Sequence, residues 1–188
     1  MFHPFNALLS FQRSRLAHAI ALTAGLVSLS TSLAVAGQHP TGQFFFDHAP
    51  RLVRAETNAI PITYVGGTAY EFTIAVPQDA GAPLQAVTIT QDGNPRTIEF
   101  NLNQSRAIAG NGTNIPLESI GGNQNTATTI AFAQPIQPGE TVTVSLKSDR
   151  NPSSEGVYLF GITAYPAGDQ EHGLFLGHGR VQIYSQGR

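Results

Sequence analysis

The sequence predicts an all-β fold, an immunoglobulin-like two-layer antiparallel β-sandwich with about seven to nine strands. Three observations lead to this class. Apolar and polar residues alternate with period two in several short runs, turn-forming Gly, Pro, Asn and Asp lie between those runs, and no stretch after residue 36 has the periodicity of an amphipathic helix. The chain has no cysteine and no tryptophan, so it lacks the Cys, Trp, Cys framework of antibody domains. The architecture is therefore better determined than the topology.

The first element, residues 1–36, has the pattern of a secretory signal peptide. Arg13 and Arg15 precede an apolar run that begins at Leu16 and ends in the small-residue triplet Ala34-Val35-Ala36. The run is long enough to cross a bilayer, so an uncleaved anchor is the alternative. Because serine, threonine and glycine dilute the far end of the run, we expect cleavage after Ala36 and no stable membrane insertion afterwards.

The next segment, residues 37–43, is predicted to be a flexible lead-in because it offers nothing apolar to pack. Residues 44–188 then form a single β-sandwich domain. The predicted strands, in order, place apolar side chains on one face at Tyr70, Phe72, Ile74 and Val76; Val87 and Ile89; Ile98, Phe100 and Leu102; Ile130 and Phe132; and Val142, Val144 and Leu146.

The last two predicted strands cover residues 156–165 and 180–184. In the first of them both faces are apolar, which is typical of a strand inside a sheet or close to a second layer. Residues 107–126 are less regular, since two glycine-rich segments flank a small apolar island at residues 115–120. A short edge strand is the favoured interpretation there, and a mobile binding loop is the alternative.

Composition limits the partners of this domain. The chain has 10 basic and 12 acidic residues, and cleavage would remove Arg13 and Arg15 from the basic set. No cluster of basic residues with interleaved aromatics is present, so nucleic acid is not expected as a partner. Thiol catalysis is impossible without cysteine, no Gly-x-Ser-x-Gly segment occurs, and no cofactor is predicted.

A metal site is the main catalytic hypothesis that the residues suggest. Asp47 and His48 lie near the start of the domain, and His172 and His178 lie near its end. Imidazole and carboxylate groups suit zinc or copper, so these four side chains would form a metal site if the first and last strands were neighbours. The spacing is not that of a known zinc motif, and solvent-facing loop histidines are the alternative.

Two segments share the pattern Asp-x-Asn-Pro, residues 92–95 and 149–152. Oxygen-rich loops of this kind can hold calcium, but neither segment continues into the ligands of an EF-hand loop. Asx-turn chemistry ahead of a rigid proline explains both segments equally well.

Binding residues are predicted where side chains lack an obvious structural task. The triplet Phe44, Phe45 and Phe46 would place one aromatic on the opposite face from the other two, so either both faces are covered or one ring is left for a partner. Core packing is the favoured interpretation, and an exposed docking or dimer surface is the alternative for which these rings are candidate binding residues. Asn111 in a glycine-rich loop and the pair Arg51 and Arg54 complete the predicted binding residues.

Several segments resemble a known family of exported cyanobacterial proteins that is defined only as a domain of unknown function. The resemblance covers residues 44–184 and is most specific after Asn151. It depends on the segments Phe45-Phe46-Asp47-His48, Pro50-Arg51-Leu52, Ala80-Gly81, Pro83-Leu84, Asn151-Pro152, Gly156-Val157-Tyr158-Leu159-Phe160-Gly161, Ala164-Tyr165-Pro166-Ala167-Gly168, Gly173, Phe175-Leu176-Gly177, Gly179-Arg180 and Tyr184. The resemblance implies a bacterial host and an extracytoplasmic setting, and it implies no activity.

The sequence therefore predicts an exported, non-enzymatic binding or structural module of the bacterial cell envelope, in the periplasm or at the cell surface. Its expected partner is an envelope protein or polymer, and its oligomeric state is left open. A metal-dependent envelope hydrolase that uses the loop histidines is the alternative function.

Overall fold

The computed structural model describes residues 37–38, 44–93, 96–123, 126–168 and 172–187. The strands of these residues are β1 (Gly37–Gln38), β2 (Phe44–Phe45), β3 (Arg51–Thr57), β4 (Ala69–Ala75), β5 (Leu84–Asp92), β6 (Glu99–Ala109), β7 (Asn114–Ile115), β8 (Leu117–Asn123), β9 (Ala127–Ile136), β10 (Thr141–Arg150), β11 (Gly156–Pro166) and β12 (Leu174–Ile183).

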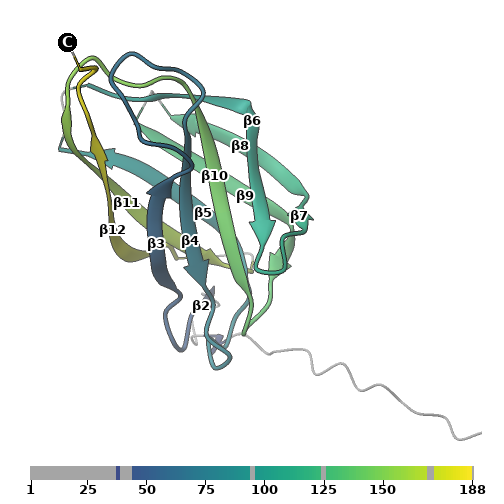
Figure 1. Cartoon of the computed structure of the whole chain (residues 1–188). Coiled ribbons are helices and arrows are strands. Elements are labelled where there is room, and N and C mark those ends of the chain that lie inside the picture. The colour runs from purple at the N-terminus through teal and green to yellow at the C-terminus, as the bar shows by residue number, and fades with distance from the viewer. Residues whose placement is uncertain (1–36, 39–43, 94–95, 124–125, 169–171, 188) are drawn as a thin grey trace, which may run out of the picture. The chain divides into compact units, whose positions relative to one another are not determined.

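Ten of these strands form two antiparallel sheets that face each other (Figure 1). The first sheet has the order β3-β4-β10-β6-β7 and the second has the order β12-β11-β5-β9-β8. Strands β1 and β2 form a separate antiparallel pair. The predicted fold class, a two-layer antiparallel β-sandwich, is confirmed.

The core fills the space between the sheets with the residues that the alternation predicted. Tyr70, Phe72 and Ile74 of β4 are each 0% exposed, as are Phe160 and Ile162 of β11. Ring centroids of Phe72 and Phe160 lie 5.2 Å apart in an edge-to-face arrangement. Because β4 and β11 belong to different sheets, these aromatic contacts join the two layers.

The sheets contain more strands than the seven to nine predicted. Strand β3 was not predicted, because a bulge between Leu52 and Arg54 interrupts its alternation of apolar and polar side chains. Strand β12 begins at Leu174, earlier than the predicted Arg180, because Gly177 and Gly179 hide its pattern.

The irregular region between residues 107 and 126 contains edge strands, as the favoured interpretation predicted. β7 pairs with β6 at one edge of the first sheet, and β8 pairs with β9 at one edge of the second. The alternative of a mobile binding loop does not apply to residues 107–123.

The first two residues of the predicted lead-in form strand β1. Gly37 and Gln38 pair with Phe45 and Phe44 through the backbone, which needs no apolar side chain, so composition gave no sign of it. The rest of the lead-in and the whole predicted signal peptide lie outside the described residues. Within those residues, no helix has the length and apolar character needed to span a bilayer.

Candidate functional site

The end of the sandwich at which β10 passes into β11 is built around one buried amide. The connection begins with Asn151, and the long loop between β3 and β4 folds against it (Figure 1). The Asn151 amide N–H donates to the Val65 carbonyl at 2.8 Å, and the Tyr64 amide N–H donates to the Pro152 carbonyl at 3.3 Å. Two loops far apart in the sequence are therefore joined directly by their backbones.

The side chain of Asn151 fixes this junction from the inside. It is 2% exposed. Its Oδ1 accepts hydrogen bonds from the Tyr70 hydroxyl at 2.7 Å and the Ser148 hydroxyl at 3.3 Å. Its Nδ2 donates to the Ile62 carbonyl at 2.9 Å and to the Thr68 hydroxyl at 3.0 Å. Both the oxygen and the nitrogen of this buried amide therefore have hydrogen-bond partners, which makes the junction rigid.

Tyr64 sits on this junction in a backbone conformation that tyrosine rarely adopts. Its φ is +66°, and it is the one non-glycine residue with positive φ among the described residues. The left-handed conformation costs a residue with a Cβ about 1–2 kcal/mol. The surrounding loop contacts hold the residue in place, while its side chain is 60% exposed. Strained residues held by their surroundings are typical of functional sites.

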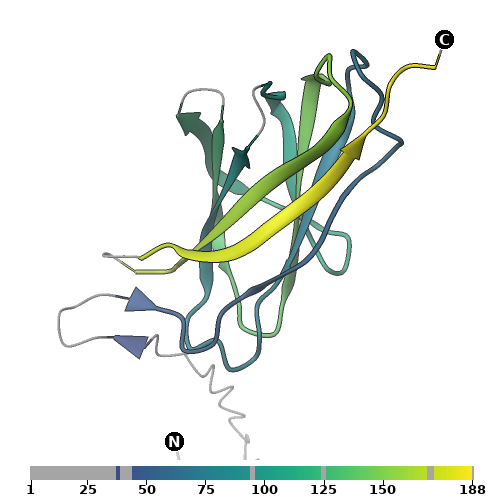
Figure 2. The same ribbon diagram turned by 90° about the vertical axis from the view of Figure 1, so that its left-hand side faces the viewer.

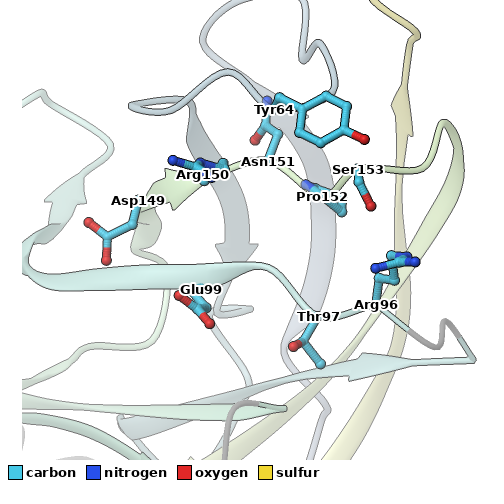
Figure 3. A pocket seen from close by; sticks show the side chains of 9 residues that line it. All are labelled: Tyr64, Arg96, Thr97, Glu99, Asp149, Arg150, Asn151, Pro152 and Ser153. Atoms are coloured by element: carbon cyan, nitrogen blue, oxygen red, sulfur yellow. The ribbon is translucent and has the colours of Figure 1, made fainter.

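The Tyr64 ring borders a hollow of about 590 Å³, which is within the size range of ligand pockets. Arg96, Glu99, Asp149 and Arg150 contribute the charged groups of its lining; its other members are Thr97, Asn151, Pro152 and Ser153. Figure 3 shows the Tyr64 ring and Arg96 at one end of the hollow and the Glu99 and Asp149 carboxylates towards the other. We call this site the Tyr64 hollow.

The charged groups of the Tyr64 hollow come from neighbouring strands. Arg150 and Glu99 are opposite each other in the register of β10 and β6. Oδ1 of Asp149 accepts a hydrogen bond from the Asn101 amide at 3.0 Å. The hollow can therefore offer a ligand an aromatic face, hydroxyl groups, cations and carboxylates, a combination suited to holding a polar ligand.

The two tyrosines beneath the hollow are held in their neutral form. Burial raises the pKa of Tyr70, whose hydroxyl is bonded to Asn151. Burial also raises the pKa of Tyr158, although the nearby positive charge of Arg96 lowers it. The Tyr158 hydroxyl donates to the Ser154 carbonyl at 2.9 Å. These shifts move both phenols away from acid–base activity at neutral pH.

The predicted metal ligands lie on different parts of the second sheet and its loops. His48 Nδ1 is 2.8 Å from the Asp79 carbonyl oxygen, just before β5 begins. His178 Nε2 is 3.1 Å from Oδ2 of Asp92, the last residue of β5. At about 3.3 Å per residue, the length of β5 separates the two histidine sites by roughly 26 Å.

Asp47 and His172 lie at the same end of the sandwich as His48. The Asp47 amide N–H donates to the Ala80 carbonyl at 2.8 Å, and the His172 amide N–H contacts the Phe44 carbonyl at 3.5 Å. Figure 2 shows the start of β12 next to β2. Among the described residues, no three histidine, aspartate or glutamate side chains lie close enough together to hold a metal ion. The proposed metal set is thus not assembled from the residues that the structure describes.

The predicted aromatic triplet divides between core and surface. Phe46 is 8% exposed and belongs to the core, whereas Phe45 is 39% exposed. Phe44 is half-buried and lies against Gly168, where a Cβ would meet its ring. The structure thus leaves Phe45 as the ring most open to a partner.

The other predicted binding residues are exposed. Arg54 pairs with Glu56 at 3.2 Å, and Oδ1 of Asn111 accepts from the Thr113 amide N–H at 3.0 Å. Arg51 and Asn111 lie at the end of the first sheet that is opposite to the Tyr64 hollow. At that end the start of β3 pairs with the end of β4, and the start of β10 pairs with the ends of β4 and β6. These predicted residues therefore do not contribute to the hollow.

The residues of the Tyr64 hollow were not predicted as a site. Residues 149–152 were recognised as a turn, and that pattern was the only available signal. The positive φ of Tyr64 and the convergence of Arg96 with Asp149 could not be predicted from the sequence, because both depend on how loops that are distant in the chain meet.

The structure is a β-sandwich with a polar hollow at one end. Residues 43–183 match the family described as "Protein of unknown function (DUF2808)", and the chain belongs to this family. The resemblance to a domain of unknown function is thus confirmed. No curated protein matches the chain significantly.

Solved structures with a similar arrangement are distant in sequence. The bacterial hydrophobin BslA is 14% identical with a TM-score of 0.49, over 75% of this chain and 98% of its own. ACE19, the collagen-binding subdomain of the Enterococcus faecalis surface protein ACE, is 8% identical with a TM-score of 0.45, over 74% and 96%. The collagen-binding domain of a Staphylococcus aureus adhesin is 7% identical with a TM-score of 0.39, over 70% and 97%. These likenesses concern the fold alone.

Proposed function

We propose that this chain is an exported, non-enzymatic binding module of a bacterial cell envelope, and that the Tyr64 hollow is its contact site. The observation that carries the proposal is the exposed Tyr64 ring, held in a strained conformation at the rim of the hollow. Strain of this kind persists only where the surrounding structure imposes it, and here the imposed result is an aromatic ring presented to solvent.

The setting of the proposal comes from the leader pattern of residues 1–36. The two buried tyrosines, Tyr70 and Tyr158, have raised pKa values, so neither acts as an acid or base at neutral pH. The cyanobacterial envelope is the host setting that the sequence resemblance suggests.

Replacement of Tyr64 by glycine tests the proposal sharply. Glycine adopts positive φ at little cost, so Tyr64→Gly should stabilise the fold by about 1 kcal/mol or leave it unchanged. The same variant should lose retention by the envelope fraction of the host in a pull-down. Gain of stability with loss of binding distinguishes a contact residue from a structural one.

Tyr184→Ala is the matched control, because Tyr184 is 51% exposed and does not line the hollow. It should keep envelope retention. If Tyr64→Gly is retained as well as the unchanged chain, or if Tyr64→Gly is clearly destabilised, Tyr64 is not a contact residue and the site assignment is wrong.

A further inference from the structure

The middle of the outer face of the second sheet consists of small uncharged residues in register, and the charged residues Asp92 and Arg180 lie beyond it on the same face. Val87 and Ile89 of β5 and Ile162 of β11 point into the core, so the residues between them point outwards. Three cross-strand rows of outward residues follow from the strand pairing: Ala127, Thr90 and Gly161; Thr129, Thr88 and Thr163; and Ala131, Ala86 and Tyr165. We call these nine positions the threonine face.

Threonine hydroxyls occupy the middle of this face. Thr88 and Thr129 are joined by a hydrogen bond of 2.8 Å between their Oγ1 atoms, and Thr163 continues the same row on β11. Thr129 is exposed, and Thr88 and Thr163 are half-buried by their neighbours. None of the nine positions is charged, and apart from Gly161 and the ring of Tyr165 they present only the hydroxyl and methyl groups of threonine and alanine.

The outer face of the first sheet has the opposite character around an equivalent pair. Thr73 and Thr143 are joined by a hydrogen bond of 3.0 Å between their Oγ1 atoms. Charged residues surround that pair on neighbouring strands: Arg54, Glu56, Glu71, Arg106 and Lys147. Solvent-facing sheets usually alternate apolar residues inside with polar residues outside. The contrast between the faces therefore singles out the threonine face as a contact surface.

One margin of the threonine face carries an exposed aromatic ring. Phe175 pairs with Thr163 at the end of the threonine row and is 55% exposed. Its ring makes an edge-to-face contact with His178, with centroids 5.1 Å apart, and His178 bonds to Asp92. A Cβ on Gly161 would lie 3.2 Å from the Phe175 ring, so the ring can lie close to β11 because residue 161 has no side chain.

The size of the face limits what can occupy it. Strands lie about 4.8 Å apart and successive outward residues about 6.7 Å apart, so the three rows cover roughly 400 Å² even with the neighbouring β8 included. A stable protein interface takes about 800 Å² from each partner. A narrow extended polymer fits this area, whereas a folded protein or a second copy needs about twice as much.

We propose that the threonine face binds a neutral polysaccharide chain. Threonine hydroxyls match sugar hydroxyls as hydrogen-bond donors and acceptors, and their methyl groups and the Phe175 ring match the apolar C–H faces of sugar rings. None of the nine positions carries a cation that could pair with carboxylates, and the Asp92 carboxylate lies beside Gly161, so an uncharged polymer is favoured over an acidic one. This inference is independent of the Tyr64 hollow.

Sedimentation of the full chain with insoluble cellulose and with chitin tests the proposal, and alginate serves as the acidic polymer. We expect retention on a neutral polymer and none on alginate. Thr88→Lys should weaken that retention by about tenfold, since an ammonium group would lie in an uncharged contact. Phe175→Ala should weaken it as well.

Thr73→Lys is the matched control, because it breaks the equivalent threonine pair on the other face. Both lysine variants should unfold at similar urea concentrations, and Thr73→Lys should bind as the unchanged chain does. The proposal is overturned if neither neutral polymer retains the chain, if alginate retains it as well, or if both lysine variants lose binding equally. A dimer that Thr88→Lys converts to a monomer would also overturn it.

Discussion

Replacement of Asn151 by alanine tests how the Tyr64 hollow is supported. The substitution removes all four side-chain hydrogen bonds of the junction. The largest loss concerns Tyr70, which is 0% exposed and keeps a hydroxyl without its acceptor. A buried polar group that loses its partner costs about 1–3 kcal/mol.

The Ile62 carbonyl and the Thr68 hydroxyl lose a donor as well, which adds roughly 1 kcal/mol. The free energy of unfolding should therefore fall by roughly 3 kcal/mol. In a domain of this size, that loss corresponds to a decrease in Tm of roughly 6–12 °C. Urea unfolding followed by circular dichroism measures the change.

A double-mutant cycle separates the hydroxyl from other effects. Tyr70→Phe removes the hydroxyl itself, so Asn151→Ala should cost about 1–2 kcal/mol less in the Tyr70→Phe background. Asn111→Ala, an exposed asparagine with a local bond to Thr113, should change stability by less than about 0.5 kcal/mol. Additive effects of the two substitutions, or a loss for Asn151→Ala no larger than for Asn111→Ala, would refute the reasoning.

Three further predictions concern pH, backbone conformation and metal content. The raised pKa of Tyr70 means that the folded chain favours the neutral phenol. The stabilisation from the neutral phenol is complete below the ordinary pKa of 10.0 and is lost as pH rises through the pKa of the folded state. Urea midpoints should therefore fall above about pH 10, and Tyr70→Phe should reduce that fall. Gly81 has a φ of +76° and a Cβ there would meet the Asp47 carboxylate, so Gly81→Ala should lower the unfolding free energy by about 1–3 kcal/mol in urea titrations. Elemental analysis of untagged protein should find no stoichiometric zinc or copper, and one equivalent that disappears in His48→Ala or His178→Ala would revive the hydrolase hypothesis.

Much of the fold could be predicted because a half-buried β-strand produces an alternation of apolar and polar residues within a short segment of the sequence. The alternation of Tyr70, Phe72 and Ile74 is the direct consequence of side chains that point to opposite faces of a strand, and all three are buried as predicted. The pattern failed where the backbone departs from regularity. The bulge after Leu52 hid β3, and the pairing of Gly37–Gln38 depends on backbone groups that every residue has.

The candidate site was predictable only in fragments. Asn151 was recognised as part of a turn, and the sequence did not distinguish the buried Phe46 from the more exposed Phe45. That Asn151 would receive the Tyr70 hydroxyl from β4 could not be predicted, because 81 residues separate them. The same holds for the row of Thr129, Thr88 and Thr163, which exists only in the register of β9, β5 and β11.

By itself, then, the sequence determined the all-β class, the inward face of most strands, and the leader pattern, since each depends on residues within one short segment. The tertiary structure alone decided which loops meet at Tyr64, which histidines are kept apart by the length of β5, and which outer face carries the uncharged rows. These properties depend on sheet order and strand register, which long-range packing selects among many pairings that the same local pattern permits.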